Sequence, residues 1–329
     1  MKKFFSLLIA LMALSVTCAK AQTSLIATLN HEGTLSTFYG STALQQAHEA
    51  AADGDVVTLS SGTFASVNIT KAITLRGAGM AMDAETQTEP TVLSNAFSID
   101  IADETTQRLT IEGIYTSQTI TIKNLKNAMF LKARFDHIDV SSSSHATDLT
   151  FIHCRNTGEV RSYANDFSAS FQNCIIAYVY GRYFTFKNCI FADNYGTGTY
   201  LYNNSEYKNC IILNPKFNGD CSSSTFYNNL YTNDGNFYIT KSNNTNIKIA
   251  TNDNRIKNLL NYYDDNDYKL IEEAKAIMKG TDGTEVGIYG GSLPYDPTPT
   301  NPQITKFNVA SKTTADGKLS VDIEVKSAE

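Results

Sequence analysis

Apolar and polar positions repeat along this chain with a period of about twenty residues. The repeated unit has an aromatic residue, an Asn and a Cys in fixed order, as in Phe171-Gln172-Asn173-Cys174-Ile175. The same order recurs in Phe186-Lys187-Asn188-Cys189-Ile190, in Tyr207-Lys208-Asn209-Cys210-Ile211 and loosely in Phe226-Tyr227-Asn228-Asn229-Leu230, while Phe151-Ile152-His153-Cys154 places His where the others have Asn. Weaker copies reach back through Leu131, Ile111 and Ile73-Thr74-Leu75. Self-similarity at this spacing is typical of a solenoid.

The repeat assigns a role to each of its positions. A coil of twenty residues cannot bury its apolar face alone, so it must stack on the next coil at about 4.8 Å with parallel strand pairing. The aromatic residue then points inward. The Asn residues are predicted to occupy a sharp left-handed corner and to bond to the Asn of the next coil, and the Cys residues to form a stack of buried apolar fillers. This structural stack comprises Asn173, Asn188, Asn209, Cys154, Cys174, Cys189 and Cys210.

The first coil is expected to be covered by a helix. Thr42 and Gln45 match a capping box, and the apolar positions Ala43, Leu44, Ala47, Ala50 and Ala51 follow on one helical face. Asp53-Gly54 ends the helix, and strands begin at Val56 and at Ile73. Such a helix protects the open end of a solenoid from edge-to-edge aggregation.

The two ends of the chain differ from its middle. Residues 1–21 have the Lys2-Lys3 start, apolar run and small-x-small site of a signal peptide, and Cys18 leaves a lipid anchor as an alternative. Pro294, Pro297, Pro299 and Pro302 predict a linker. The predicted organisation is therefore a signal peptide at 1–21, a lead-in at 22–40, the solenoid with its cap at 41–291, a Pro-rich linker at 292–303 and a β-hairpin or partial module at 304–329. We expect the hairpin, centred on Asp316-Gly317, to pack back on the solenoid, because a lone hairpin is marginal in water.

The fold class that follows is all-β: a single-stranded, right-handed parallel β-helix with an N-terminal capping helix and a C-terminal hairpin tail. The 329 residues carry a formal charge of −6, and loss of Lys2, Lys3 and Lys20 with the signal peptide makes it −9. An acidic chain without a basic tract argues against a nucleic-acid partner. No segment after the signal peptide is apolar enough to cross a membrane. We expect an exported monomer of the periplasm, the outer surface or the extracellular space.

Two stretches resemble a known group. They are Gly54-Asp55-Val56-Val57-Thr58-Leu59 with Gly62-Thr63-Phe64, Ile69, Lys71, Ile73-Thr74-Leu75, Gly77 and Gly79, and, near the end, Asp267-Tyr268-Lys269-Leu270, Ala276-Ile277, Gly280-Thr281-Asp282-Gly283 and Gly287-Ile288-Tyr289-Gly290-Gly291. Over residues 40–291 the chain resembles the pectate-lyase-like right-handed β-helix superfamily, and within it uncharacterised exported bacterial proteins. The resemblance implies the fold but no single activity, because the superfamily includes lyases, hydrolases and adhesins. It implies Ca²⁺ by analogy only, and no cofactor is predicted.

Candidate chemistry is sparse. Lyases of this superfamily use an Arg or Lys base, for which the middle coils offer Arg155, Arg161, Arg182 and Lys187, although outward charges are the default on such strands. Asp264, Asp265 and Asp267 form the densest acidic cluster, with a solvated turn as the favoured interpretation and a calcium site as the alternative. The paired Asp and Gly-His-Gly of polygalacturonases and the Asp-His of pectate lyases are absent. The cysteines left after processing number five, which favours free thiols over disulfides or metal binding.

The tyrosines give the most specific hypothesis. Tyr178, Tyr180 and Tyr183 crowd one coil, and Tyr195, Tyr200 and Tyr202 crowd the next. Alternation along a strand cannot bury all of them, and an outward tyrosine can stack on a sugar ring and hydrogen-bond to it. We therefore favour a non-catalytic β-helix that binds or presents complex carbohydrate. A polysaccharide lyase or glycoside hydrolase is the alternative, and an adhesive or structural protein acting through protein contacts is a third.

Overall fold

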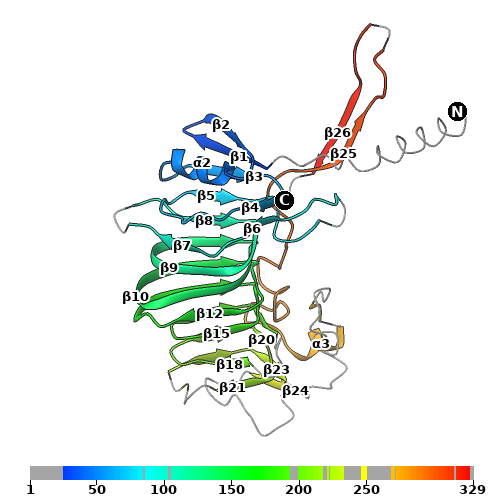
Figure 1. The fold of residues 1–329 in the computed structure, drawn as a ribbon. Coiled ribbons are helices and arrows are strands. Elements are labelled where there is room, and N and C mark those ends of the chain that lie inside the picture. Colours follow the sequence, from blue (N-terminus) through cyan, green and yellow to red (C-terminus); the bar gives the residue numbers. More distant parts are fainter. Residues whose placement is uncertain are drawn as a thin grey trace, which may run out of the picture.

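The chain folds into an elongated parallel β-helix of about eight turns, as the repeat predicts (Figure 1). This computed structural model describes residues 25–83, 86–102, 105–192, 199–217, 221, 223–232, 246–249, 268–270, 272–314 and 316–326. The predicted signal peptide with Cys18, together with Tyr195 and the acidic cluster Asp264, Asp265 and Asp267, lies outside the described residues.

Within these residues the parallel strands stack into three sheets, one on each side of the coil. The first sheet contains β3 (Val56–Leu59), β5 (Thr74–Arg76), β8 (Thr110–Glu112), β13 (Asp166–Gln172), β16 (Phe184–Lys187), β19 (Glu206–Lys208) and β22 (Thr225–Tyr227). The second contains β4 (Gly62–Phe64), β6 (Thr91–Leu93), β11 (Arg155–Asn156), β14 (Ile175–Ile176), β17 (Ile190–Phe191), β20 (Ile211–Leu213), β23 (Leu230–Thr232) and β24 (Ile247–Ile249).

The third sheet contains β7 (Phe97–Asp100), β12 (Glu159–Ser162) and β15 (Tyr178–Tyr180), followed by the pair β18 (Thr199–Leu201) and β21 (Pro215–Phe217). Two long strands, β9 (Ile114–Leu131) and β10 (Arg134–Ile152), bend around the coil and contribute to all three sheets. Each coil therefore has three corners, which we name by order: the first corner joins the first and second sheets, the second joins the second and third, and the third returns to the first sheet.

The core follows from the repeat. In the first sheet the inward aromatic residues form one continuous stack, with ring centroids 4.4–5.2 Å apart, through Phe130, Phe151, Phe171, Phe186, Tyr207 and Phe226. The cysteines Cys154, Cys174, Cys189, Cys210 and Cys221 are buried and free. Burial raises the pKa of the Cys174 and Cys210 thiols, which keeps them protonated and suits their role as apolar fillers.

The N-terminal cap is larger than the helix that the sequence predicts. Helix α2 (Ala43–Ala50) buries Ala43, Leu44, Ala47 and His48, but Thr42 makes no capping hydrogen bond, so the capping box is wrong. The Thr42 hydroxyl instead accepts a hydrogen bond from the Gln46 side chain. The lead-in forms an antiparallel hairpin of β1 (Ile26–His31) and β2 (Thr34–Tyr39), and β1 pairs antiparallel with β3. Alternation in these short strands was too brief to predict them.

The C-terminal part returns along the solenoid. After α3 (Glu272–Ile277), residues 279–301, the return segment, run back from the last described coils to the first ones (Figure 1). Lys132 Nζ binds Asp296 at 2.8 Å, and the Asn301 amide donates to the carbonyl of Gly77 at 2.7 Å. The predicted Pro-rich linker is therefore laid against the solenoid over most of its length. Its prolines suit this because an extended strap needs no ladder of N–H donors.

The C-terminal hairpin forms as predicted, but it does not pack back. Strands β25 (Gln303–Val309) and β26 (Val321–Lys326) pair antiparallel and project away from the solenoid (Figure 1). Every residue of β26 is exposed. Lys306 bridges Asp322 and Glu324 on one side of the hairpin, which leaves Val321, Ile323 and Val325 on the other.

The first corner shows why Asn recurs. Its residues hold a left-handed backbone with φ between 48° and 55°, and they form the first-corner column: Lys132, His153, Asn173, Asn188, Asn209 and Asn228. The corner geometry of the Asn residues is thus confirmed, but the predicted amide ladder is wrong. The Asn173 amide donates to the carbonyls of Ile288 and Gly290, at 2.8 and 2.7 Å. Several side chains of the column therefore bond to the return segment, whereas backbone N–H groups of the column bond to the next coil.

Candidate functional site

The third corner is open, unlike the first. Here three successive turns, after β12, β15 and β18, surround a cleft of about 550 Å³. We call it the tyrosine cleft, and its lining residues are Ser162, Tyr163, Ala164, Asn165, Tyr180, Gly181, Arg182, Tyr183, Tyr202 and Asn203. Because one turn from each coil contributes, the cleft runs along the solenoid axis and crosses the strands.

Aromatic rings form the walls of the cleft. Tyr163 packs against Tyr180 with centroids 5.1 Å apart, and Tyr180 packs against Tyr202 at 5.2 Å. Tyr202 is buried, whereas Tyr163 and Tyr183 are 49% and 45% exposed. The inner rings are therefore fixed by packing, and the two outer rings present faces to solvent. This is the combination of an apolar body and polar hydroxyl that suits a wet, aromatic binding surface.

A hydrogen bond joins two of the tyrosines beside the cleft. The hydroxyls of Tyr178 and Tyr202 are 2.9 Å apart, and burial raises the pKa of Tyr178. The Tyr200 ring packs edge-on to Tyr178 with centroids 6.1 Å apart, and Lys216 Nζ lies 5.9 Å from the Tyr200 centroid. Tyr178 and Tyr200 thus support the cleft from the side and do not line it.

The backbone of the middle turn is adapted to this corner. Gly181 has φ +132°, and a Cβ there would lie 2.6 Å from the carbonyl oxygen of Ser162 in the coil above. Tyr183 has φ +67°, which is unusual for a bulky residue. Its N–H donates to the carbonyl of Asn204 at 3.0 Å. Backbone contacts therefore hold Tyr183 in a conformation that its own side chain disfavours, and they direct that side chain outward.

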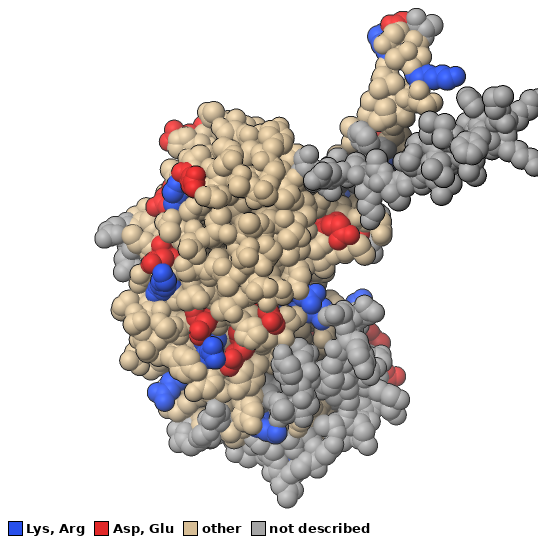
Figure 2. Space-filling view, viewed as in Figure 1, with Lys and Arg blue, Asp and Glu red and all other residues tan. Residues whose placement is uncertain are grey.

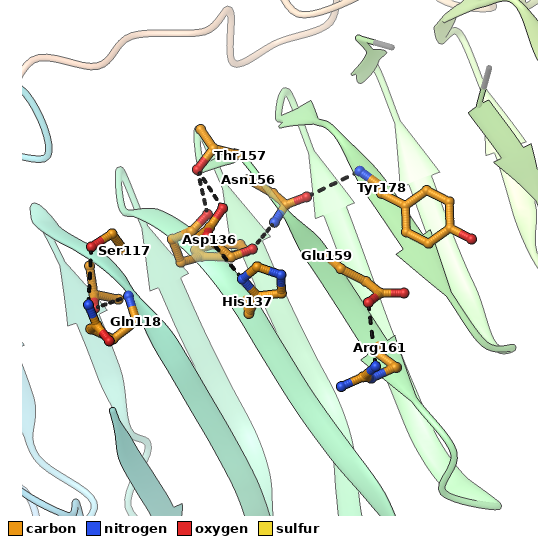
Figure 3. A network of polar contacts seen from close by, with 11 residues as sticks. Ser117, Gln118, Asp136, His137, Asn156, Thr157, Glu159, Arg161 and Tyr178 are labelled. Carbon is orange, nitrogen blue, oxygen red and sulfur yellow. Dashed lines mark hydrogen bonds and ion pairs between the residues drawn. The ribbon is translucent and has the colours of Figure 1, made fainter. Parts of the chain in front are cut away.

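A row of ionisable side chains adjoins the cleft on the third sheet. This acid–base row comprises Asp136, His137, Asp139, Glu159 and Arg161, and Figure 3 shows most of it, on two adjacent coils. Arg161 lies 3.2 Å from Asp139 and 3.7 Å from Glu159, and its guanidinium is 5.7 Å from the centroid of Tyr163. Figure 2, in the same orientation as Figure 1, shows acidic and basic side chains close together over these middle coils.

The second corner anchors one end of this row. Asp136 accepts a hydrogen bond from Thr157 at 3.2 Å and lies 3.0 Å from His137 Nδ1. The Asn156 amide donates to the carbonyl of Asp136 at 2.9 Å, and its oxygen accepts from the Tyr178 N–H at 3.4 Å (Figure 3). Asn156, which is buried, therefore links three coils at this corner.

The four cations proposed as catalytic candidates do not come together. Arg182 lines the tyrosine cleft and Arg161 adjoins it, whereas Lys187 lies on the first sheet. Arg155, on the second sheet, lines a separate groove of about 270 Å³ beneath the return segment, with Tyr289 and Tyr295 among its walls. The hydrogen bond to Asp139 raises the pKa of Arg161 above its usual value. A guanidinium that holds its proton more tightly is less often present as the free base that proton abstraction requires.

Of the six tyrosines singled out in the sequence, Tyr180, Tyr183 and Tyr202 line the cleft, Tyr178 and Tyr200 support it, and Tyr195 is not described. Sequence reasoning missed Tyr163, Ser162, Asn165 and Asn203. Tyr163 lies in the turn just after β12, and Arg182 and Tyr183 lie in the corresponding turn after β15. An alignment of the coils by their turns would have found it, whereas the Phe-x-Asn-Cys repeat aligns them by the first corner.

Among the residues that the structure describes, no group of three or more His, Cys, Asp or Glu side chains is arranged to hold a metal ion. No described helix has the length and apolar character needed to cross a membrane.

Comparison with known proteins gives no relative: no family model, no curated protein and no solved structure matches this chain. The site geometry alone therefore carries the functional argument.

Proposed function

We propose that this protein binds complex carbohydrate through the tyrosine cleft, as an exported and non-catalytic member of the pectate-lyase-like β-helix proteins. The observation that carries the proposal is the exposure of Tyr163 and Tyr183 at the mouth of a cleft whose inner wall is fixed tyrosine. Sugar rings stack on such faces, and the Asn165 amide and the amide N–H groups of Asn203 can bond to their hydroxyl groups.

The backbone supports the same proposal. A tyrosine with a left-handed backbone destabilises the folded state by on the order of 1 kcal/mol, and the packing of a half-exposed side chain offsets little of this free energy. Strained residues of this kind cluster where a side chain is held for a ligand. Tyr183 fits that description better than it fits a packing role.

The test is affinity electrophoresis of the purified protein in native gels that contain single polysaccharides, over a broad panel. We expect retention by at least one polymer. Replacing both Tyr163 and Tyr183 by Ala should weaken it by about tenfold, from ~0.7 kcal/mol for each lost aromatic contact. Tyr39→Ala is the matched control, because Tyr39 is 63% exposed but lies in β2, in the N-terminal cap. Lack of retention on every polymer would refute the proposal.

The same preparation tests catalysis. Acidic polysaccharides are incubated with the protein, with and without calcium, and absorbance of unsaturated products is followed in the ultraviolet. The proposal expects no rise. A rise would make the protein a lyase, and Ala substitutions at Arg155, Arg161, Arg182 and Lys187 would then locate the base. Release of reducing ends without absorbance would show a glycoside hydrolase.

A second candidate is an adhesive role through protein contacts, which the projecting hairpin favours. Val321, Ile323 and Val325 are 48–57% exposed on one side of β26. In this case Ile323→Lys would abolish binding to a protein partner, and the Tyr163 and Tyr183 substitutions would leave it unchanged. Under the carbohydrate proposal Ile323→Lys should leave polysaccharide retention unchanged, whereas the Tyr163 and Tyr183 substitutions should weaken it.

A further inference from the structure

The charges around the tyrosine cleft bear on the class of its ligand. Among the described residues that line the cleft, Arg182 is the only one with a charged side chain. The other polar groups there are hydroxyls and amides, which donate and accept hydrogen bonds without a net charge. Such groups match the hydroxyl groups of a sugar ring.

One cation beside the outer wall, Arg161, is already neutralised by ion pairs. Arg161, whose guanidinium is 5.7 Å from the Tyr163 centroid, bridges Asp139 at 3.2 Å and Glu159 at 3.7 Å. These three side chains are 23–38% exposed, so solvent screens the pairs only in part. The ion pairs hold the guanidinium on the third sheet and leave it little attraction for a carboxylate on a ligand.

The flank of the cleft is acidic as a whole. The acid–base row contains three carboxylates, Asp136, Asp139 and Glu159, together with Arg161 and His137. A polymer with a carboxylate on every sugar would bring further negative charge beside this row, and among the described residues that line the cleft Arg182 is the one cation that could offset it. Like charges brought together without partners oppose binding.

We infer that the ligand of the tyrosine cleft is a neutral glycan, an inference that rests on the carbohydrate binding proposed above. The glycan lies along the solenoid axis, because the cleft crosses three coils. At about 4.8 Å for each coil step, the three turns span roughly 10 Å, which suits a stretch of a few sugar rings. The aromatic walls supply contact area, and the acidic flank excludes polyuronates.

The experiment compares neutral polysaccharides with polyuronates in native affinity gels, at low and at high sodium chloride. We expect retention by a neutral polymer that salt leaves unchanged, because stacking and neutral hydrogen bonds are not screened. Polyuronates should not retain the protein. The double variant Asp139→Asn with Glu159→Gln removes both partners of Arg161 and should gain retention on polyuronates that high salt abolishes, while its retention on the neutral polymer persists.

Two failures are distinguishable. Retention on polyuronates alone, lost at high salt and in Arg182→Gln, would overturn the neutral-glycan inference and leave carbohydrate binding intact. Retention on no polymer would overturn carbohydrate binding itself. Thermal unfolding of each variant, followed by circular dichroism, checks that the fold is preserved, and the single Glu159→Gln variant serves if the double variant does not fold.

Discussion

The first and third corners of the same coils place non-glycine residues in a left-handed backbone, and they do so to different ends. At the first corner the residues of the column are largely buried, and several of their polar atoms bond to the return segment. At the third corner Tyr183 has the same kind of backbone, yet its side chain is 45% exposed. One corner is closed by the chain itself, and the other is left open.

The difference lies in what compensates the backbone strain. Asn tolerates the left-handed region because its short side chain can bond locally, and Asn173 and Asn209 add bonds to the return segment. Tyrosine has no such tolerance, and the contacts that hold Tyr183 are those of its backbone. Residues at the corners of successive coils can therefore be structural or functional. They are structural where their polar side-chain atoms bond to the chain itself, as in the first-corner column, and functional where the side chain faces solvent, as at Tyr183.

The largest effect is expected at Asn173. It is fully buried, and replacement by Ala removes two hydrogen bonds, leaves the carbonyls of Ile288 and Gly290 without this donor and places Ala at φ 50°. We expect the free energy of unfolding to fall by about 2–4 kcal/mol. Urea denaturation monitored by circular dichroism measures it.

Asn173→Gly separates the two causes. Gly adopts the left-handed backbone freely, so Asn173→Gly loses the two hydrogen bonds without the backbone strain that Ala has at this φ. It should therefore be about 1 kcal/mol more stable than Asn173→Ala. Equal stability of the two variants would show that the left-handed conformation costs Ala no more than the extra backbone entropy that glycine gives the unfolded chain. Neither variant should alter polysaccharide retention under conditions in which it is folded.

A smaller effect is expected from acid at His153 in the same column. Burial, and then the charge of Lys132, outweigh the bond to Leu293 and the charge of Asp296, so the pKa of His153 is lowered from 6.5. The unfolded chain therefore binds a proton that the folded chain resists. Stability is fully present above about pH 6.5 and falls as the pH drops from there through the lower pKa of the folded state.

The pH dependence has a matched control. Burial also lowers the pKa of His48 in α2, so both histidines contribute in the same direction. His153→Gln should reduce the loss of stability between pH 7 and pH 5, and His48→Gln should remove only the part that belongs to the cap. If His153→Gln left the slope unchanged, the return segment would not be the acid-sensitive element.

The repeat predicted most of the fold because inward positions in a solenoid have few alternatives. Phe171, Phe186 and Tyr207 must stack if the coils stack, so a local pattern determined a global architecture. The return segment could not be predicted in this way. Its contacts join residues that are far apart in the sequence, 72 positions for Asn209 with Thr281 and 117 for Asn173 with Gly290, and neither local sequence indicates which residue the other will contact. The prolines that predicted a linker are equally compatible with an extended segment bound along the solenoid.

The candidate site was predicted only in part, and for a physical reason. Crowded tyrosines indicated that some must face outward, but alternation alone could not say which. Tyr178 and Tyr202 turned out to bond to each other, whereas Tyr183 is exposed because Gly181 and the left-handed turn redirect it. The pairing of Arg161 with Asp139 depends on strand register, which a sequence without an alignment does not give.

The smallest effect on stability is expected where the contrast between the corners is sharpest. Tyr183→Gly relieves the left-handed strain, worth about 1–2 kcal/mol, but glycine adds about 0.5–1 kcal/mol of backbone entropy to the unfolded chain and the half-exposed ring contacts are lost. The terms nearly cancel, so the free energy of unfolding should stay within about 0.5 kcal/mol of the starting protein, whereas Tyr183→Ala keeps the strain and should be about 1 kcal/mol less stable than Tyr183→Gly. Both variants should weaken polysaccharide retention equally, because both lack the ring. A large destabilisation by Tyr183→Gly would place Tyr183 with Asn173 as a structural residue and remove the strain argument for the cleft.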